Sequence, residues 1–339
     1  MRCAHWTEDG LELVDEKPPP LTPGWVRLRV LANGICGTDV HLFRRELPPL
    51  VGNVPGHELV GRPTDGPTQL PESLYAVEPI HWCGGCDDCL AGNRHRCPQL
   101  RIFGIQLRGG LAETIDVPRA CLHAVDPRVS VLVASLAEPF AVAVRGLHLA
   151  RLETDSRVLV LGAGTIGLMS ALLARDRAAA VAISARHPQQ RKLAESLGVT
   201  ALEESQIDAW AGENAPDVVI ETVGGHAETL AEATRSCRAG GRIIVIGVFS
   251  RPMPVNVIEL LVKELSLVGS NTYGTTLRGP EFRSAVELLP RYHSELQPLL
   301  THQFPLSSVH EAFRCASQKA SGAIKVTVLP GQAGGSEHS

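Results

Sequence analysis

The sequence predicts an α/β protein that combines a strand-rich first part with a doubly wound parallel sheet. Two observations lead to this prediction. Up to Pro118 the chain reads as strands and loops with little helical periodicity. From Arg157 onward, continuous β-branched and aliphatic runs alternate with helical segments, the pattern of a parallel sheet with helices on both faces. The 339 residues leave room for two domains.

The composition is that of a globular protein. Hydrophobic residues make up 44% of the chain and charged residues 20%, so a sizeable core can be buried. The net charge of −4 gives no general attraction to nucleic acid or acidic lipid, and no apolar run is long enough to span a bilayer. The N-terminus shows no apolar stretch of a secretory signal. We therefore expect a cytoplasmic protein without nucleic-acid or membrane partners.

The first part of the chain is expected to begin with strands. Val26–Val30 alternates with a period of two, and the prolines at 18–20 and 23 exclude a helix before it. Short strands are expected at Glu58–Gly61 and Tyr75–His81, on either side of a loop at 62–72.

The stretch from Gly34 to Glu58 gathers groups that bind metals. It contains Cys36, His41, His57 and Glu58 in a span punctuated by glycines. Zinc is bound by thiolate, imidazole and carboxylate, and a catalytic zinc keeps one position open. The same residues are also compatible with a buried cysteine on a strand edge and a His–Glu pair in a surface turn.

Four of the nine cysteines crowd into a short lobe at 83–97. Cys83, Cys86, Cys89 and Cys97 are spaced so that four thiolates can converge on one metal ion, with glycines permitting the tight turns. Four sulfurs leave no open position, so we expect a structural zinc. A disulfide-bonded loop fits a reducing compartment poorly, and an iron–sulfur cluster is the alternative on ligand type.

The first clearly helical region is expected over 130–149. Within it, Glu138 stands directly before Pro139, and proline is favoured in a first helical turn. The carboxylate of Glu138 either stabilises the helix dipole or contributes to the metal site, and the residues alone leave both interpretations open.

A glycine turn follows the apolar strand that begins at Arg157. Gly162, Gly164 and Gly167 form a GxGxxG pattern between a strand and a helix, with Thr165 and Ile166 in the same turn. In that context the backbone can approach a pyrophosphate closely and helix amides face it. Further strands are expected at 178–184, 217–224, 241–248 and 264–269, with helices at 188–197, 227–237 and 257–263. These features predict a dinucleotide-binding domain.

The end of the second strand of this domain indicates which dinucleotide binds. An acidic residue is expected there to hold the ribose 2′-hydroxyl, but the sequence offers Ser184 with Arg186 close behind. A small uncharged residue beside a cation suits a 2′-phosphate, so we expect NADP to be preferred. The alternative is a solvated Arg186 and binding of NAD through a weaker ribose contact.

The tail is expected to hold helices at 280–289 and 307–319 and a strand at 323–330, followed by a disordered Gly/Ser-rich end at 331–339.

Several of these motifs together resemble the zinc-dependent medium-chain dehydrogenases. The matching stretches are Gly34–His41, Gly56–Glu58, the four-cysteine lobe, Glu138–Pro139, Gly162–Gly167, Lys263–Ser270 and Ala323–Val326. The resemblance implies a catalytic domain of GroES-like distorted β-barrel type at 1–145, a Rossmann domain at 146–275 and a return to the catalytic domain at 276–330. It also implies an active site in the cleft between the domains, and a homodimer or homotetramer.

The resemblance also implies roles for individual residues. Glu138 stands where alcohol dehydrogenases have a second cysteine, as in the sorbitol, threonine and sugar dehydrogenase branch. Cys36 and His57 would then bind the catalytic zinc, and Glu58 and Glu138 would compete for the remaining position. Thr38 would relay the substrate proton, with His41 as a further step. The expected cofactor contacts include, besides the glycine turn, Ser184 and Arg186, the residues Val223, Gly247 and Ser270.

We therefore expect a zinc-dependent oxidoreductase that interconverts a secondary alcohol, such as a polyol, sugar or cyclitol, and its ketone with NAD(P). One segment departs from the family pattern, because the usual Gly-Asp-Arg-Val strand is replaced by Pro71–Glu78, so substrate identity does not follow. Two alternatives are a non-catalytic NADP-binding sensor and a zinc-free quinone or enoyl reductase of the same superfamily. The retained metal-site residues disfavour both.

Overall fold

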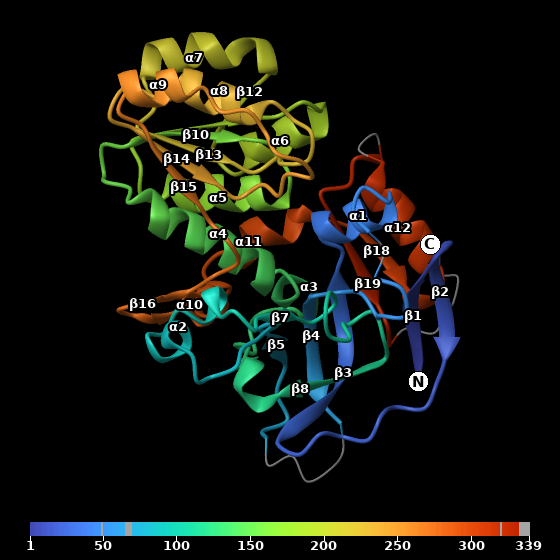
Figure 1. Ribbon diagram of the computed structural model, residues 1–339. Coiled ribbons are helices and arrows are strands. Elements are labelled where there is room, and N and C mark those ends of the chain that lie inside the picture. Colours follow the sequence, from blue (N-terminus) through green and yellow to red (C-terminus); the bar gives the residue numbers. More distant parts are fainter. Residues whose placement is uncertain (49, 65–69, 319–320, 332–339) are drawn as a thin grey trace. The chain divides into compact units, whose positions relative to one another are not determined.

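The computed structural model describes residues 1–48, 50–64, 70–318 and 321–331, in two compact units (Figure 1). Unit 1 comprises Met1–Glu138 and Gly274–Ser339, and unit 2 comprises Pro139–Tyr273. The expected domain boundaries after residues 145 and 275 stay predictions. Residues 65–69 of the expected loop, and 332–339 of the expected disordered end, lie outside the described residues.

Unit 1 is organised around a seven-stranded sheet with the order β18-β19-β3-β4-β5-β9, in which β8 also pairs with β3. The long strand β3 pairs with β8 through its first half and with β4 through most of its length, so it connects the two sides of the sheet. The strands are β3 (Trp25–Gly34), β4 (Glu58–Pro63), β5 (Tyr75–Val77), β8 (Thr114–Pro118), β9 (Leu122–Ala124), β18 (Leu300–Pro305) and β19 (Lys325–Leu329).

The end of the chain packs on its beginning within unit 1. β19 pairs antiparallel with β3 and parallel with β18. Strand β18 was not predicted from the sequence. The rings of Trp6 and Phe313 meet edge to face at 5.6 Å, inside a core that the N-terminal strands share with helix α12 (Val309–Ser317). The smaller strand pairs of the unit are β1 (Arg2–Thr7) with β2 (Gly10–Asp15), β6 (Ile80–His81) with β7 (Arg101–Ile102), and β16 (Thr275–Thr276) with β17 (Gly279–Pro280).

Two short helices that the sequence did not predict lie before the first clearly helical region expected over 130–149. Helix α1 spans Gly37–Phe43, directly after β3, and a short helix α2 lies at Asp87–Leu90. Helix α1 is too short to show an apolar period, since only Asp39 and Leu42 of its residues are buried. The other α-helices of unit 1 are α3 (Val131–Ala134), α10 (Glu281–Leu288), α11 (His293–Leu296) and α12 (Val309–Ser317), and α4 (Ala137–Ala150) begins there and continues into unit 2.

Unit 2 has the expected doubly wound architecture, which is thereby confirmed. Its six parallel strands have the order β12-β11-β10-β13-β14-β15, so the direction of winding reverses between β10 and β13. Ligands of such sheets bind beyond the carboxyl ends of the strands at this reversal. The strands are β10 (Arg157–Leu161), β11 (Ala180–Ser184), β12 (Thr200–Leu202), β13 (Val218–Glu221), β14 (Arg242–Val245) and β15 (Ser266–Gly269).

Helices cover both faces of this sheet. Helices α7, α8 and α9 lie on one face, and α4 and α5 lie on the other (Figure 1). Helices α6 (Pro188–Ser196), α8 (Thr229–Ser236) and α9 (Val257–Val262) were expected, and α4 lies within the helical region expected over 130–149 except for its last residue. The start of α5 (Thr165–Arg175) after the glycine turn was also expected. Helix α7 (Ile207–Asn214) was not predicted, because its two buried residues give no clear apolar stripe.

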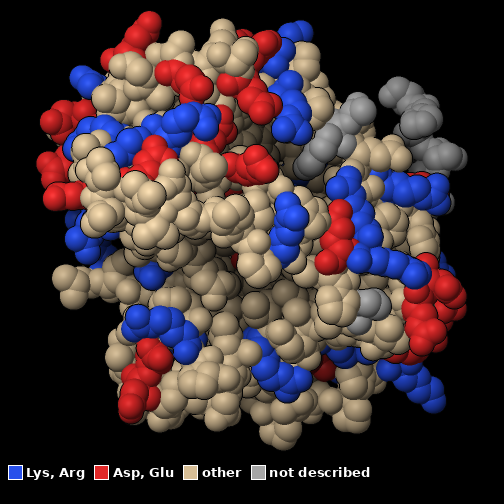
Figure 2. Space-filling view, turned by 45° about the horizontal axis from the view of Figure 1, so that its top comes forward, with Lys and Arg blue, Asp and Glu red and all other residues tan. Residues whose placement is uncertain are grey.

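Among the described residues, no helix combines the length and the apolar character needed to cross a bilayer. On the face drawn in Figure 2, basic and acidic side chains are interspersed rather than gathered into a patch of one sign.

Candidate active site

The strand pair β3–β4 brings the residues of the first motif together in unit 1. Cys36 follows the end of β3 at the start of α1, and His57 immediately precedes β4. In the pairing of these strands, Gly34 stands opposite Glu58. One donor atom from each of Cys36, His57 and Glu58 lies within 4.8 Å of the others. His57 and Glu58 are buried, so this is an enclosed group of thiol, imidazole and carboxylate.

Glu58 has a buried cationic partner that the sequence analysis did not assign. The ammonium of Lys325 lies 2.8 Å from Oε1 and 2.5 Å from Oε2 of Glu58, and it also donates to the carbonyl of Ile35 at 3.1 Å. Burial alone would lower the pKa of Lys325, but the charges of Glu58 and Cys36 outweigh it and the pKa is raised. The available signal was a lysine within the otherwise apolar strand β19, because lysine is almost never fully buried without a partner.

Asp39 is a second residue that the sequence analysis did not assign. It is completely buried, and its Oδ2 accepts a hydrogen bond of 3.0 Å from the amide of Cys36. Its Oδ1 faces Nδ1 of His57 at 3.9 Å, a distance too long for a hydrogen bond. Burial raises the pKa of Asp39, and the charge of His57 and the Cys36 amide offset only part of that rise. Asp39 therefore ties the start of α1 to the His57 ring.

The electrostatics of the site keep His57 and Glu138 away from their ordinary pKa values. Burial lowers the pKa of His57, but the charges of Asp39 and Cys36 raise it well above the usual range. Burial raises the pKa of Glu138 to about 7; His57 opposes this rise and Glu58 adds to it. Glu138 is thus close enough to feel the same charges, although it is not one of the three residues whose donor atoms lie within 4.8 Å.

The residues present fit a metal ion. A half-buried thiol beside a buried imidazole and a buried carboxylate at this spacing provides the donor types of a catalytic zinc with an open position.

Thr38 and His41 both lie on α1, next to this group. Thr38 is one position before Asp39, and its side chain is half-buried. His41 is also half-buried, and its Nδ1 contacts the carboxylate of Glu46. The two residues are three positions apart, so they share one face of the helix.

The four-cysteine lobe forms a second donor cluster in unit 1. The sulfurs of Cys83, Cys86, Cys89 and Cys97 all lie within 4.8 Å of one another. Backbone amides of Gly85 and Cys86 lower the pKa of Cys83 to about 6, and burial raises that of Cys89 to about 12. Amides of Cys83 and Gln99 also approach the sulfur of Cys97 at 3.4 Å. Amide donors around converging sulfurs suit a bound thiolate set.

A third cluster in unit 1 is less suited to a metal. Cys3, His5 and Glu16 also bring donor atoms within 4.8 Å of one another. The guanidinium of Arg108 pairs with Glu16 and approaches the Cys3 sulfur, so the cluster already holds a cation. Burial raises the pKa of the Cys3 thiol to about 11, which disfavours the thiolate form that binds metals.

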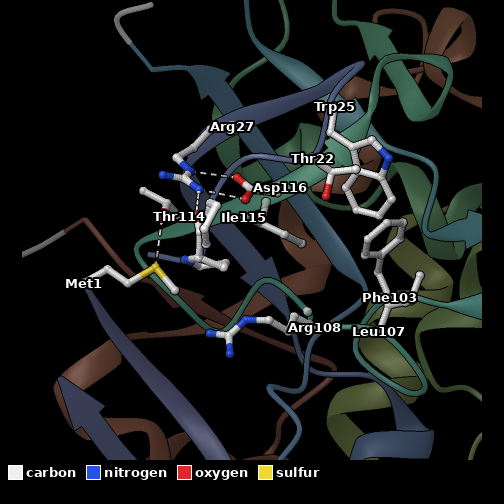
Figure 3. A pocket seen from close by; sticks show the side chains of 13 residues that line it. Met1, Thr22, Trp25, Arg27, Phe103, Leu107, Arg108, Thr114, Ile115 and Asp116 are labelled. Carbon is white, nitrogen blue, oxygen red and sulfur yellow. Dashed lines mark hydrogen bonds and ion pairs between the residues drawn. The ribbon is translucent and has the colours of Figure 1, made fainter. Parts of the chain in front are cut away.

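A cavity of about 190 Å³ in unit 1 does not contain the expected site residues. Its wall includes Trp25, Phe103 and Met1, together with the Arg27–Asp116 ion pair (Figure 3). Because the charges of Arg27 and Asp116 neutralise each other, the cavity offers no free charged group from this pair for a ligand.

The glycine turn of unit 2 has the geometry that its sequence predicted. Gly162 has φ of +98°, which only glycine adopts without strain. A Cβ at Gly167 would overlap the carbonyl oxygen of Gly162, so helix α5 can start at Thr165 only with a glycine in its first turn. Ile166 lies between Thr165 and Gly167. The N-terminus of α5 follows the carboxyl end of β10.

The end of β11 carries the residues expected to choose between cofactors. The hydroxyl of Ser184 accepts a hydrogen bond of 3.0 Å from the amide of Gly162. Arg186 is largely exposed, 3.8 Å from Glu204. Arg191, which the sequence analysis did not assign, donates to the carbonyls of Ala185 and Arg186 at 3.1 and 3.2 Å and so supports the backbone that carries Arg186.

The remaining expected cofactor residues follow the ends of β13, β14 and β15. Val223 is 45% exposed, and its Cγ2 lies only 2.6 Å from where a Cβ of Gly162 would be. Gly247 packs against the loop after β13, because a Cβ there would overlap the amide of Gly224. The hydroxyl of Ser270 is buried at the end of β15 without a hydrogen-bond partner among the described residues.

The fold and these donor groups together define the class of a zinc-type oxidoreductase that uses a dinucleotide. The sequence profile of the alcohol dehydrogenase GroES-like domain matches residues 22–127, and that of the zinc-binding dehydrogenases matches residues 165–291. The expected GroES-like domain is thereby confirmed.

Known proteins match over nearly the whole chain. The 2-dehydro-3-deoxy-L-galactonate 5-dehydrogenase of Pseudoalteromonas atlantica is 30% identical over 86% of this chain and 87% of its own length. The L-arabinitol 4-dehydrogenase of Talaromyces emersonii is 28% identical over 96% of this chain and 90% of its own length. A zinc-binding dehydrogenase of Sinorhizobium meliloti, solved bound to NADP, superposes with a TM-score of 0.86 at 30% identity, covering 97% of this chain and 99% of that one.

The chain belongs to the zinc-dependent medium-chain dehydrogenase family, as its motifs predicted. It is an enzyme that interconverts an alcohol and a carbonyl compound, with zinc and a nicotinamide dinucleotide as cofactors.

The packing of Gly34 against Glu58 leads to a prediction about metal binding. A Cβ at position 34 would overlap Oε2 of Glu58, so Gly34→Ala must displace that carboxylate. We expect the zinc content after dialysis against a mild chelator to fall from about two toward about one per chain, because a displaced site residue typically weakens metal affinity by ~10–100-fold. Atomic absorption measures the zinc, and circular dichroism checks the fold.

Gly37→Ala is the matched control, because a Cβ there would meet nothing within 4 Å. It should keep the wild-type zinc content. Equal zinc retention in Gly34→Ala and Gly37→Ala would contradict the assignment of this group as a metal site.

Proposed function

We propose that this enzyme oxidises a secondary hydroxyl of a polyol or sugar acid to a ketone, reversibly and with preference for NADP. The observation that carries the proposal is the enclosed group of Cys36, His57 and Glu58, whose donor atoms lie within 4.8 Å of one another in a member of this family. The relatives that act on a dehydro-deoxy-galactonate and on L-arabinitol support the substrate class.

In this proposal Cys36, His57 and Glu58 hold the catalytic zinc. Asp39 faces Nδ1 of His57, which leaves Nε2 of the ring to bind the metal. Lys325 compensates the charge of Glu58, so a carboxylate can be buried beside a thiolate. Glu138 stands next to this group, but it is not one of the three residues whose donor atoms lie within 4.8 Å of one another. We therefore prefer Glu58 to Glu138 as the third ligand. The four cysteines of the lobe hold the structural zinc.

The reaction divides into the transfer of a hydride and of a proton. A zinc ion at this site acts as a Lewis acid that lowers the pKa of the substrate hydroxyl. Thr38 receives the hydroxyl proton, and His41, which contacts Glu46 at the surface end of α1, passes it onward to solvent. A bound nicotinamide would accept, at its C4, the hydride from the substrate carbon that carries this hydroxyl. The loops after β10 and β13 carry Gly162 and Val223, which we propose to contact the dinucleotide.

The two alternative functions explain the presence of the donor groups less well. A non-catalytic NADP-binding sensor has no need for an enclosed thiol, imidazole and carboxylate. A zinc-free quinone or enoyl reductase requires these positions to be replaced, and all three residues are present.

A substrate panel tests the proposed function. Polyols, sugar acids, cyclitols and amino alcohols are assayed with NADP and with NAD by the absorbance of the reduced nicotinamide. We expect turnover with polyols or sugar acids and a higher kcat/KM with NADP, because Ser184 and Arg186 suit a 2′-phosphate. Absence of turnover with every member and both cofactors would instead support the sensor.

Arg186→Ala isolates the cofactor preference, with Arg177→Ala as an exposed control in the same unit. Loss of a charge-assisted contact should raise the KM for NADP by about tenfold and leave that for NAD unchanged. An equal rise in KM for NADP and for NAD, or a preference of the wild-type enzyme for NAD, would show that Arg186 does not select NADP.

We further propose a homo-oligomer, as a dimer or a tetramer, in which α9 and β15 are covered by a second copy. Val257, Ile258, Leu261 and Val262 on α9 are each at least 70% exposed. β15 is an edge strand of the sheet, with Leu267 exposed and unpaired backbone groups on its outer side. An apolar helix beside an open strand edge suits a two-fold related copy of the same surface.

The double variant Ile258→Asp/Leu261→Asp tests this surface. Burying two carboxylates in an apolar interface is unfavourable, so we expect the variant to dissociate to monomers in size-exclusion chromatography with light scattering. Val51→Asp places a charge at another exposed valine and should keep the wild-type mass. A monomeric wild-type protein, or a double variant of unchanged mass, would exclude the proposed interface.

We also propose a reducing compartment such as the cytoplasm. None of the nine cysteines, all of which lie among the described residues, forms a disulfide, including the four that crowd together in the lobe. Sulfurs as close as 3.9 Å, the separation of Cys83 and Cys89, would readily oxidise in an oxidising compartment unless a metal bound them.

A further inference from the structure

A carboxylate without an assigned role lies beneath the expected cofactor residues of unit 2. Glu221 ends β13, next to the reversal of strand order, and none of it is exposed to solvent. Fully buried glutamates are rare, because burying a charge is costly unless hydrogen bonds compensate it. The partners of Glu221 therefore indicate what its charge is used for.

One oxygen of Glu221 organises the loop that follows it. Oε1 accepts hydrogen bonds from the amides of Val223 and Gly224, at 2.8 and 2.9 Å, and from the hydroxyl of Thr229 at 2.7 Å. Consecutive amides that point at one oxygen form an anion-binding concavity. Here the anion is the protein's own side chain, so the carboxylate fixes the backbone of the loop.

The other oxygen of Glu221 borders the loop after β14. Oε2 is buried and has no hydrogen-bond partner among the described residues. A Cβ at Gly247 would overlap this oxygen and also the amide of Gly224. The backbone carbonyl of Glu221 accepts from the amides of Ile246 and Gly247, at 2.9 and 3.1 Å. Glu221 thus touches both loops, and Gly247 must be small because of it.

The loop held by Glu221 in turn contacts the glycine turn. The hydroxyl of Thr222 donates to the carbonyls of Leu161 and Gly162 at 2.8 and 3.1 Å. Val223 packs against Gly162, so closely that a Cβ at Gly162 would lie 2.6 Å from the Val223 side chain. The loop that Glu221 holds therefore contacts the end of β10 through Thr222 and Val223, and the end of β14 through Gly224.

We propose that Glu221 is a positioning residue for the nicotinamide dinucleotide. Its carboxylate binds the amides of Val223 and Gly224, and so holds Val223 against Gly162 and Gly224 against Gly247. These contacts shape the surface of Gly162, Val223 and Gly247 on which the dinucleotide binds. Glu221 itself is covered by these loops and does not touch the cofactor. This inference rests on the proposed assignment of Gly162, Val223 and Gly247 to the cofactor site.

The test compares how tightly two variants of Glu221 bind NADPH at equilibrium. A fluorescence titration of the zinc-loaded enzyme measures this binding. Glu221→Ala removes the acceptor for three donors and should weaken binding by about tenfold or more, because the amides of Val223 and Gly224 lose the charged group that holds them. Glu221→Gln keeps a carbonyl oxygen for the same three donors and should stay within about threefold of wild type. In turnover assays, KM for the cofactor should rise in Glu221→Ala while kcat at saturation changes little.

Thr229→Val separates positioning from general stability. It removes one of the three hydrogen bonds to Glu221 without altering the loop amides, so it should lower the melting temperature and leave NADPH affinity unchanged. An affinity loss in Thr229→Val equal to that in Glu221→Ala would overturn the proposal, as would wild-type affinity in Glu221→Ala or equal losses in Glu221→Ala and Glu221→Gln.

Hydrogen exchange of the wild-type enzyme provides a test that does not depend on the folding of a variant. The amides of Val223 and Gly224 should exchange as slowly as those of the neighbouring strands, and exchange as fast as an open loop would overturn the proposal. If the wild-type chain bound neither NADPH nor NADH, the proposed function itself would fail, and this inference with it. Binding by the wild type with an unaffected Glu221→Ala defeats the inference alone.

Discussion

The buried ion pair between Glu58 and Lys325 is the interaction on which the catalytic unit depends. It connects β4 near the start of the chain to β19 near its end, across 267 residues of sequence. Two opposite charges inside a protein are tolerated only together, because removing one partner leaves an uncompensated buried charge that costs ~3–5 kcal/mol. The pair therefore ties the C-terminal segment to unit 1 at the place where Cys36 and His57 come together. Gly34 completes the arrangement, since only a residue without a side chain leaves room for the Glu58 carboxylate.

Much of the fold and of the site could be predicted from the sequence because the decisive signals are local. The glycine turn at 162–167 follows an apolar strand directly, and the four cysteines lie within fifteen positions of one another, from Cys83 to Cys97. Cys36 and His57–Glu58 flank the adjacent ends of two paired strands, so their meeting follows once β3 and β4 are paired. The family's motif order supplied the rest, including the interruption of the catalytic unit by the dinucleotide domain.

The features that escaped prediction depend on contacts between distant segments or on short elements. Lys325 stands at the start of a mostly apolar strand, which hints that it is buried but does not identify Glu58 as its partner. Asp39 becomes meaningful only through the helix α1, whose seven residues are too few to show a period. The role of Glu221 could not be predicted either, because a glutamate at the end of an apolar strand does not indicate that three donors converge on it. Sequence patterns specify periodic elements well and specific side-chain pairs poorly.

The central claim is that the group around Cys36 and His57 supports zinc-dependent hydride transfer, and isotope transfer measures this most directly. A polyol carrying deuterium on the reacting carbon is incubated with NADP and the enzyme, before and after removal of the catalytic zinc under conditions that retain the four-cysteine zinc. Nuclear magnetic resonance then detects deuterium at C4 of the reduced nicotinamide. The account predicts transfer by the zinc-loaded enzyme, its loss on zinc removal and its return when zinc is restored. Transfer that continues unchanged without the catalytic zinc would contradict it.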